Sequence, residues 1–190
     1  IDVLRSRRVD GLIVLNGRLS DQALKNTAKH LPIVVTGRNI KGAGLFALNF
    51  DNFAGGVLAT EHLISLGHRK IAFISGDAAH PDANERLRGY TTALKNAGIP
   101  FDANLVVPGD YQVESGLAAT DLLLASRRKF TAIFCANDQM AYGAALSLHR
   151  KGLRTPEDVS LIGFDDIYHS LYVAPPLSTI HQPAYEMGRL

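Results

Sequence analysis

The side chains of this sequence that could hold a small polar molecule come shortly after short apolar segments. Four of them offer complementary chemistry, namely Arg86, Tyr111, Asn137 and Asp165. Arginine presents a rigid fork of donors, and a carboxylate offers two acceptor oxygens that can hold a pair of vicinal hydroxyls. An asparagine amide donates and accepts at once, and a tyrosine combines a flat apolar face with a polar tip. Together these groups favour a polar, uncharged or weakly charged ligand such as a sugar.

Other polar residues occupy equivalent positions in the sequence. They are Asn16, Gly37-Arg38, the group His80, Asp82 and Asn84, the pair Gly109-Asp110, Asp138 directly after Asn137, and Asp166 directly after Asp165. In an open parallel sheet, ligands bind outside the carboxyl ends of the strands. If the apolar segments are such strands, all of these groups face one cleft.

Each candidate also has a purely structural interpretation. Arg86 could pair with Glu85 on a helix surface, and Tyr111 could pack in a cleft wall without touching a ligand. Asp138 directly precedes a helical segment and is equally well placed as its N-cap. The two adjacent aspartates at the end of the last apolar segment point in different directions, and we assign the structural turn role to Asp166.

Several other kinds of site are not supported. The run from Gly42 to Ala47 matches a dinucleotide fingerprint superficially, but a strand follows it, so a phosphate would lack its helix N-terminus. His62 and His68 have the wrong spacing to share a metal ion. No serine lies in a nucleophile elbow, and Cys135 sits inside an apolar strand. We therefore expect no metal, no cofactor and no catalysis.

The elements that position these groups alternate along the chain. Short β-rich runs, several of them continuously apolar as in buried parallel strands, cover residues 11–15, 32–36, 45–50, 70–75, 104–108, 131–135 and 159–164. Amphipathic helical segments lie between most of them, at 20–30, 54–66, 84–97 and 139–151. Glycine ends the last three of these helices. The pattern predicts an α/β fold with right-handed crossovers.

Two places break this alternation. Leu45–Phe50 follows the preceding strand with only a Gly-rich loop between them, which we interpret as a strand leaving one sheet for a neighbouring one. Three prolines bracket Leu177–Gln182, a second candidate crossover. We therefore predict two doubly wound parallel-sheet lobes joined by crossover strands. Residues 1–49 form part of an N-terminal lobe, 50–176 form the C-terminal lobe, and 177–190 return to the N-terminal lobe.

The composition is that of an ordinary globular protein, with 46% hydrophobic residues and a formal charge of +2 over 190 residues. No basic run exceeds Arg127–Lys129, so the chain shows no nucleic-acid footprint of its own. The single cysteine rules out an internal disulfide and fits a reducing compartment. No apolar run approaches the roughly 20 residues of a membrane span, and no signal peptide opens the chain. The first residue is Ile1, and we expect the chain to be part of a longer protein.

Five segments together resemble the LacI/GalR family of transcriptional regulators. They are Asp51–Ala72, which opens with Asp-Asn-Phe-Ala-Gly-Gly; Arg86–Ile99; Phe130–Ala141, which holds Ala-Asn-Asp-Gln-Met-Ala; Gly152–Asp166, which ends in Ile-Gly-Phe-Asp-Asp; and Pro175–Pro183. The match runs from about Val9 to the end, and the motifs are highly specific in combination. The resemblance implies a type I periplasmic-binding-protein-like core of two α/β lobes.

The resemblance also implies which residues contact an effector. Family contacts carry over onto Arg86, Tyr111, Asn137 and Asp165, with Gln182 as a weaker candidate. The loop of residues 80–84 matches the family's specificity region, where we choose His80 and Asp82 for ligand discrimination. Many sugar-responsive members carry Asp before the arginine that matches Arg38, where this chain has Gly37, and we expect Arg38 to reach into that gap.

The implied function is that of a sensor. In this family, effector binding in the cleft changes the orientation of the two lobes. This change alters the operator affinity of an N-terminal helix-turn-helix domain. We expect this chain to lack that domain and the first strand–helix units of the N-terminal lobe. We therefore predict the ligand-sensing core of a cytoplasmic, homodimeric repressor that binds a sugar or glycoside and has no membrane partner. The alternatives are a periplasmic sugar-binding receptor of a transporter and, less favoured, a sugar-processing enzyme.

Overall fold

The computed structural model describes residues 9–15 and 19–190, and the chain divides into two compact units. The first unit is Ile1–Phe50 with Tyr185–Leu190, and the second is Asp51–Ala184. Both consist of parallel strands and helices, which confirms the predicted α/β class. Within the described ranges, none of the helices combines the length and the apolar character that crossing a membrane requires.

The first unit contains a three-stranded parallel sheet in the order β1-β2-β3. Its strands are β1 (Leu12–Leu15), β2 (Ile33–Thr36) and β3 (Leu45–Leu48). Helix α2 (Asp21–Ala28) begins at the predicted N-cap Ser20, whose side chain accepts a hydrogen bond from the backbone N–H of Ala23. Buried Leu24 and Ile33 belong to its small apolar core.

Strand β3 does not leave for a neighbouring sheet, so that part of the sequence-based interpretation is wrong. It pairs with β2 in parallel, with Ile33 opposite Leu45. The loop between the two strands makes the return that a crossover helix makes elsewhere in the fold. Gly44 in this loop has φ +72°, and a Cβ there would lie 2.5 Å from the carbonyl oxygen of Ala28. Only glycine allows the loop to approach α2 so closely.

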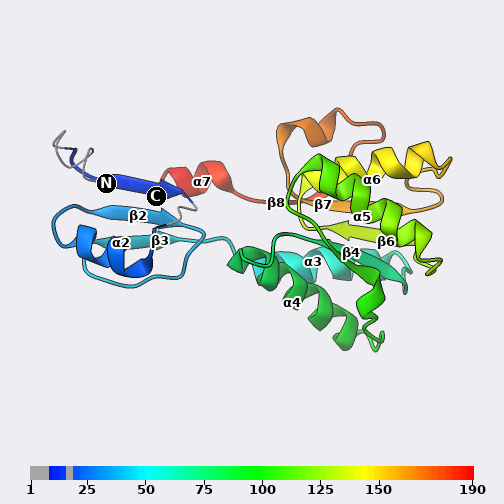
Figure 1. The fold of residues 1–190 in the computed structure, drawn as a ribbon, viewed down its shortest axis with the longest axis horizontal. Helices are drawn as coiled ribbons and strands as arrows, with labels where there is room; N and C mark the ends of the chain where they lie inside the picture. The colour runs from blue at the N-terminus through cyan, green and yellow to red at the C-terminus, as the bar shows by residue number, and fades with distance from the viewer. Residues whose placement is uncertain (1–8, 16–18) are drawn as a thin grey trace. The chain divides into compact units, whose positions relative to one another are not determined.

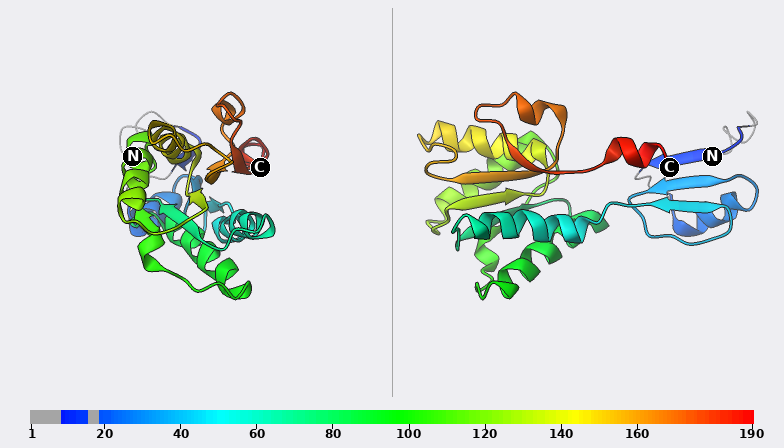
Figure 2. Two further views of the ribbon diagram at one scale, coloured as in Figure 1. Left: turned by 90° about the vertical axis from the view of Figure 1, so that its right-hand side faces the viewer. Right: turned by 180° about the vertical axis from the view of Figure 1, so that it is seen from behind.

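The second unit contains a five-stranded parallel sheet in the order β5-β4-β6-β7-β8 (Figure 1). The strands are β4 (Ile71–Ser75), β5 (Val106–Pro108), β6 (Ala132–Cys135), β7 (Ser160–Asp165) and β8 (Ser178–His181). The helices are α3 (Asn52–Ser65), α4 (Pro81–Asn96), α5 (Val113–Ala125) and α6 (Asp138–Arg150), with 3-10 turns η1 (Ala103–Leu105) and η2 (Tyr168–Leu171). Figure 2 shows α3 and α4 packed together on one face of the sheet and α5 and α6 on the other. Helix α5 was not among the helices predicted from the sequence.

The order of these strands creates a topological switch point between β4 and β6. From β4 the chain passes through α4 to β5 on one side, and then through α5 to β6 on the other side of β4. The connections diverge at the carboxyl ends of β4 and β6, which is where ligands bind in open α/β sheets. By this rule, Gly76 and Ala136, the residues that follow these two strands, mark where a ligand is expected to bind.

The last crossover lies further along the chain than the sequence suggested. Residues 178–181 form β8, which pairs with β7 as an edge strand of the second unit, with Asp165 opposite His181. The chain passes to the first unit after Ala184, within the short helix α7 (Ala184–Gly188). Gln182 thus lies directly after a strand end of the second unit, next to the end of β7.

Candidate functional site

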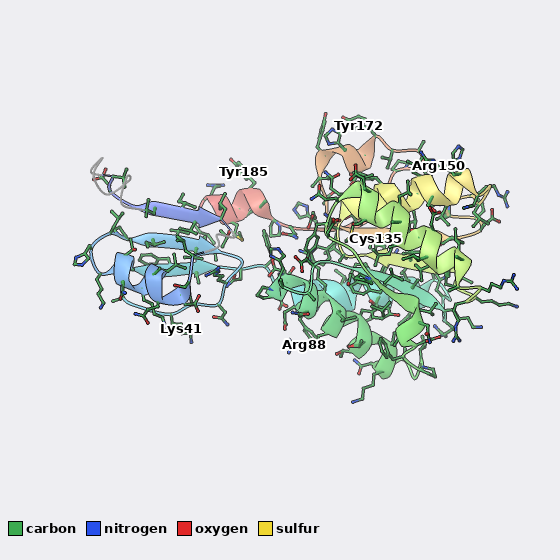
Figure 3. All side chains as sticks on the ribbon, in the orientation of Figure 1. Lys41, Arg88, Cys135, Arg150, Tyr172 and Tyr185 are labelled. Atoms are coloured by element: carbon green, nitrogen blue, oxygen red, sulfur yellow. The ribbon has the colours of Figure 1, made fainter. Side chains whose placement is uncertain are left out.

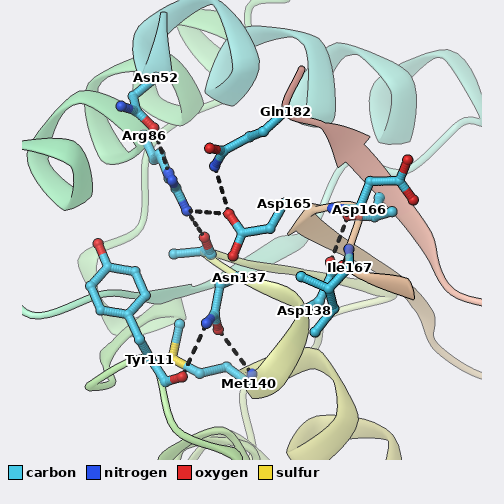
Figure 4. A network of polar contacts seen from close by, with 12 residues as sticks. Asn52, Arg86, Tyr111, Asn137, Asp138, Met140, Asp165, Asp166, Ile167 and Gln182 are labelled. Carbon is cyan, nitrogen blue, oxygen red and sulfur yellow. Dashed lines mark hydrogen bonds and ion pairs between the residues drawn. The ribbon is translucent and has the colours of Figure 1, made fainter. Parts of the chain in front are cut away.

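Arg86 lies in α4 with its guanidinium buried at the carboxyl edge of the five-stranded sheet (Figure 4). Its Nε donates to Oδ1 of Asn52 at 2.9 Å, and its Nη1 donates to the carbonyl oxygen of Ala136. The guanidinium carbon lies 3.8 Å from the ring centroid of Phe164, close enough for a cation–π interaction. Burial lowers the pKa of Arg86, and neighbouring carboxylates, Asp165 first, oppose this shift.

The surface ion pair that sequence reasoning offered as an alternative belongs to a different arginine. Glu85 pairs with Arg88, whose Nη2 lies 2.5 Å from the glutamate Oε2. Arg88 has 61% of its side chain exposed, whereas the value for Arg86 is 6%. Figure 3 shows Arg88 at the surface of the second unit. Two arginines separated by two positions therefore have opposite environments, and the buried one faces the strand ends.

Asp165 ends β7 and carries the carboxylate nearest to Arg86. Its Oδ1 lies 3.5 Å from Nη1 of Arg86 and accepts a hydrogen bond from Nε2 of Gln182 at 2.6 Å. Burial raises the pKa of Asp165 to about 6, and the attraction of Arg86 opposes this rise without cancelling it. Asp165 has φ +112°, a conformation that a non-glycine residue adopts only where its surroundings impose it.

Asn137 precedes α6 and is its N-cap. Its Oδ1 accepts from the backbone N–H of Met140 at 2.9 Å, and its Nδ2 donates to the carbonyl oxygen of Tyr111 at 3.0 Å. The alternative that Asp138 caps this helix is therefore wrong, because the side chain that holds the free backbone N–H belongs to the residue before it. Asn137 ties the loop after β5 to the loop after β6, and this use leaves one of its amide protons for a ligand.

Tyr111 follows β5 with φ +70° and packs its ring against the backbone of Gly76. A Cβ at Gly76 would lie 2.0 Å from Cζ of Tyr111, so only glycine leaves room for the ring. The Tyr111 hydroxyl is buried and has no hydrogen-bond partner among the described residues. Burial raises the pKa of Tyr111 to about 12, so the hydroxyl keeps its proton at neutral pH.

His80 and Asp82 lie at the amino end of α4, beside Tyr111 and Arg86. The His80 ring meets the ring of Tyr111 edge-on, with 6.0 Å between centroids, and His80 Nε2 lies 4.0 Å from Asp77 Oδ2. Burial raises the pKa of Asp82, and the charge of Arg86 opposes the rise. Both residues are therefore close to the cluster, as the sequence predicted.

The structure brings seven of the eight predicted contacts together in the second unit. They are His80, Asp82, Arg86, Tyr111, Asn137, Asp165 and Gln182. Arg38 lies in the first unit, where Nη1 donates to the carbonyl oxygen of Leu19 and forms an ion pair with Asp21 Oδ1 at 3.3 Å. The predicted reach of Arg38 into the gap beside Gly37 stays a prediction. Asn16 lies outside the described residues.

Asn52 is a site residue that sequence reasoning did not single out. It is 5% exposed at the start of α3, and its amide oxygen holds Nε of Arg86. The sequence feature that could have indicated Asn52 is its position directly after the N-cap Asp51, in the segment that follows β3. Its partner lies 34 residues away in the chain, so no local pattern connects the two.

A separate cavity, the search for a metal site and the single cysteine do not change the assignment of this cluster as the candidate site. A cavity of about 920 Å³ lies against α3, α6 and the prolines before β8, and none of the predicted effector contacts lines it. Among residues 9–15 and 19–190, no three histidine, cysteine, aspartate or glutamate side chains lie close enough to hold a metal ion. Cys135 is buried within β6 (Figure 3), where burial raises the pKa of its thiol.

Comparison with known proteins places this chain among regulators. Residues 60–190 match the model of the periplasmic binding protein-like domain. The HTH-type transcriptional repressor PurR of Haemophilus influenzae is 39% identical over 193 residues, covering all of this chain and 56% of the repressor. The chain thus spans about half the length of the curated relatives it matches.

Solved structures agree with the sequence matches. A sugar-binding transcriptional regulator of the LacI family from Escherichia coli, complexed with phosphate, is 34% identical with a TM-score of 0.89, covering 98% of this chain and 68% of that one. A LacI-family regulator from Enterococcus faecium with bound ribose is also 34% identical with a TM-score of 0.89, covering 98% and 70%. We conclude that this chain belongs to the periplasmic-binding-protein-like domains of the LacI family of transcriptional regulators.

Proposed function

We propose that this chain is the effector-sensing core of a LacI-type DNA-binding regulator, in which a small polar molecule binds at the carboxyl edge of the five-stranded sheet and controls operator binding. The observation that carries the proposal is the cluster of Arg86, Asp165 and Gln182 at the switch point of the sheet, beside the unpartnered hydroxyl of Tyr111. Buried polar groups normally have partners, and a ligand hydroxyl would supply one here.

The chemistry of the cluster favours a carbohydrate, either a free sugar or a glycoside. The Asp165 carboxylate can accept from two neighbouring hydroxyls, while Arg86 and the Tyr111 hydroxyl donate to ligand oxygens. The edge-on rings of His80 and Tyr111 supply an apolar wall for the C–H face of a sugar ring. The Enterococcus faecium relative was solved with bound ribose, which agrees with this class of effector.

The output of the sensor is transcriptional. The relatives from Haemophilus influenzae, Escherichia coli and Enterococcus faecium are regulators, so the transport-receptor alternative is not favoured. We propose that the whole protein is a cytoplasmic homodimeric repressor whose helix-turn-helix domain lies outside this chain, and that it leaves its effector chemically unchanged. Coupling between effector and operator is reciprocal and typically amounts to about 1–3 kcal/mol.

Calorimetry on the full 190-residue chain tests the binding site. D-ribose, D-glucose, cellobiose and methyl β-D-glucoside form the first panel, and Arg86→Ala and Asp165→Asn are the site variants. Each substitution removes a charged hydrogen-bonding group worth about 1.5–3 kcal/mol, so we expect the Kd of a binding sugar to rise by about 10- to 100-fold. The matched control is Arg88→Ala, which removes an exposed arginine from the same helix and should leave the Kd unchanged.

Two results would contradict the proposal. If both site variants bind the sugar as tightly as the wild-type chain, the cluster is not the effector site. If the wild-type chain binds no sugar of an enlarged panel but binds another class of small molecule at the same residues, the site stands and the carbohydrate assignment is wrong. A gel-shift assay on the full-length protein, with and without the identified effector, tests operator control.

A further inference from the structure

Asp138 is a fully buried carboxylate that the effector site as described does not use. It lies directly after the N-cap Asn137, at the start of α6, and none of its surface is exposed. Its two oxygens accept three hydrogen bonds. The donors are the backbone N–H of Ile167 at 3.0 Å, the hydroxyl of Ser170 at 2.7 Å and the hydroxyl of Thr179 at 2.5 Å.

These donors surround the turn that carries Asp165, whose carboxylate belongs to the proposed effector site. Asp165 and Asp166 have consecutive positive φ values of +112° and +57°, and Ile167 follows them directly. Thr179 lies on the neighbouring strand β8, and its hydroxyl oxygen also accepts from the backbone N–H of Asp166 at 3.3 Å. Asp138 therefore holds the residue after the turn and, through Thr179, the turn itself.

Strand β7 leaves space for the Asp138 carboxylate at Gly163, which has no side chain. A Cβ on Gly163 would lie 2.2 Å from Oδ1 of Asp138, so only glycine leaves the space. Non-glycine residues with positive φ are strained and persist only where the surroundings impose this conformation. In Figure 4 Asp138 lies beneath the Asp165–Ile167 turn, on the side opposite Arg86.

We propose that Asp138 is a positioning residue, which fixes the strained Asp165–Asp166 turn so that the Asp165 carboxylate meets Arg86, Gln182 and the effector. The role of the effector rests on the proposed function. The positioning of Asp165 does not, because every contact that defines it joins two residues of the chain itself. A carboxylate suits this task, since it is acceptor-only and can serve three donors. An asparagine would place an amide N–H against one of them.

Nuclear magnetic resonance of the ligand-free, full 190-residue chain tests the positioning directly. The side-chain amide protons of Gln182 report on the Asp165 carboxylate, to which Nε2 donates. The backbone amides of Asp166 and Ile167 report on the turn. In Asp138→Asn we expect the Gln182 signal to move toward that of a solvent-exposed amide and exchange at Asp166 and Ile167 to accelerate at least about tenfold, since about 1.4 kcal/mol of lost protection is a factor of ten.

The matched control is Asp121→Asn. Asp121 also accepts a side-chain hydrogen bond, from Ser147 at 2.7 Å, but it lies on α5 away from the turn. The Asp121→Asn substitution should leave the signals of the Gln182 side-chain amide and of the Asp166 and Ile167 backbone amides unchanged. If Asp138→Asn does not fold, Thr179→Val and Ser170→Ala each remove one donor and keep the buried carboxylate, and the same signals decide. Unchanged Gln182 and turn signals in a folded variant would overturn the proposal.

Calorimetry then links the turn to binding. With a sugar that the wild-type chain binds, we expect Asp138→Asn to raise the Kd about tenfold, as for the loss of one charged hydrogen bond, and Asp121→Asn to leave it unchanged. An unaltered Kd together with a disordered turn would overturn the link to effector binding. A wild-type chain that binds no sugar contradicts the proposed function instead, and the resonance signals still decide whether Asp138 positions Asp165.

Discussion

Replacing Asp165 with asparagine should stabilise the second unit at neutral pH while weakening effector binding. The reason is that the folded chain holds this carboxylate in an environment that disfavours its charge. Burial is the largest cause, and nearby Asp138 and Asp82 add repulsion, while Arg86 at 3.5 Å compensates only in part. Such a cost is expected where a group is retained for binding and not for stability.

The size of the effect follows from the pKa. Asp165 has a pKa of about 6 in the folded chain against an ordinary value of 3.8. At 1.36 kcal/mol per pKa unit, a fully charged Asp165 destabilises the fold by at most about 3 kcal/mol. The side chain is 31% exposed, so water screens part of this energy, and we expect a gain of about 1–2 kcal/mol for Asp165→Asn at pH 8.

The direction of the pH dependence is determined by the raised pKa. The folded state holds the Asp165 proton more tightly than the unfolded state, so its contribution to stability is fully present below pH 3.8 and is lost as the pH rises through about 6. The advantage of Asp165→Asn over the wild-type chain should therefore be small at pH 4 and reach its full value at pH 7 to 8. Any effect of asparagine on the positive φ at this position does not vary with pH.

Urea unfolding at pH 4, 5, 6, 7 and 8 measures this difference. The chain has no tryptophan, and five of its six tyrosines lie in the second unit, so tyrosine fluorescence reports mainly on that unit. Asp121→Asn is the control for removing a carboxylate elsewhere in the unit. A difference in unfolding free energy between wild type and Asp165→Asn that is the same at pH 4 and pH 8 would refute the reasoning.

Two further substitutions test how the site is built. Gly76→Ala should displace the Tyr111 ring, because the new Cβ would lie 2.0 Å from Cζ of Tyr111. We expect a loss of about 1–3 kcal/mol in unfolding free energy together with weaker sugar binding. Unchanged ring proton resonances of Tyr111 together with an unchanged unfolding free energy would show that the ring has room. Asn137→Ala should lower the unfolding free energy by about 1 kcal/mol, because the N-cap of α6 is lost. Asn137→Ser should restore most of this free energy. If the serine variant unfolds at the same urea concentration as the alanine variant, the cap is not what Asn137 contributes.

Local features of the fold could be predicted from the sequence because they depend on near neighbours. Apolar runs of five or six residues became parallel strands of three to six residues, and Ser20 caps α2 as its side-chain chemistry suggested. The boundaries of the strands moved by one or two residues. Helix α5 was missed, and its buried face is built from small residues such as Gly116 and Ala119, so its apolar periodicity is weak.

The pairing of strands was less accessible. Strand β3 pairs with β2 after a loop that contains no helix, and a sequence pattern carries no record of which strand lies beside which. The same limitation affected the last crossover, because nothing in Ser178–His181 shows that β7 is its neighbour. Pairing depends on which edges remain open after the rest of the sheet has formed, and this is a property of the whole unit.

The sequence by itself determined which chemical groups lie at the carboxyl ends of the strands, since a strand end and the polar residue after it are adjacent in the chain. Only the tertiary structure decided how each group is used. It buried Arg86 against Asn52 and left Arg88 at the surface, made Asn137 the cap in place of Asp138, and set Asp138 beneath the strained turn of Asp165. The partners in these contacts are 3 to 34 residues apart, and burial, not sequence distance, sets their energies.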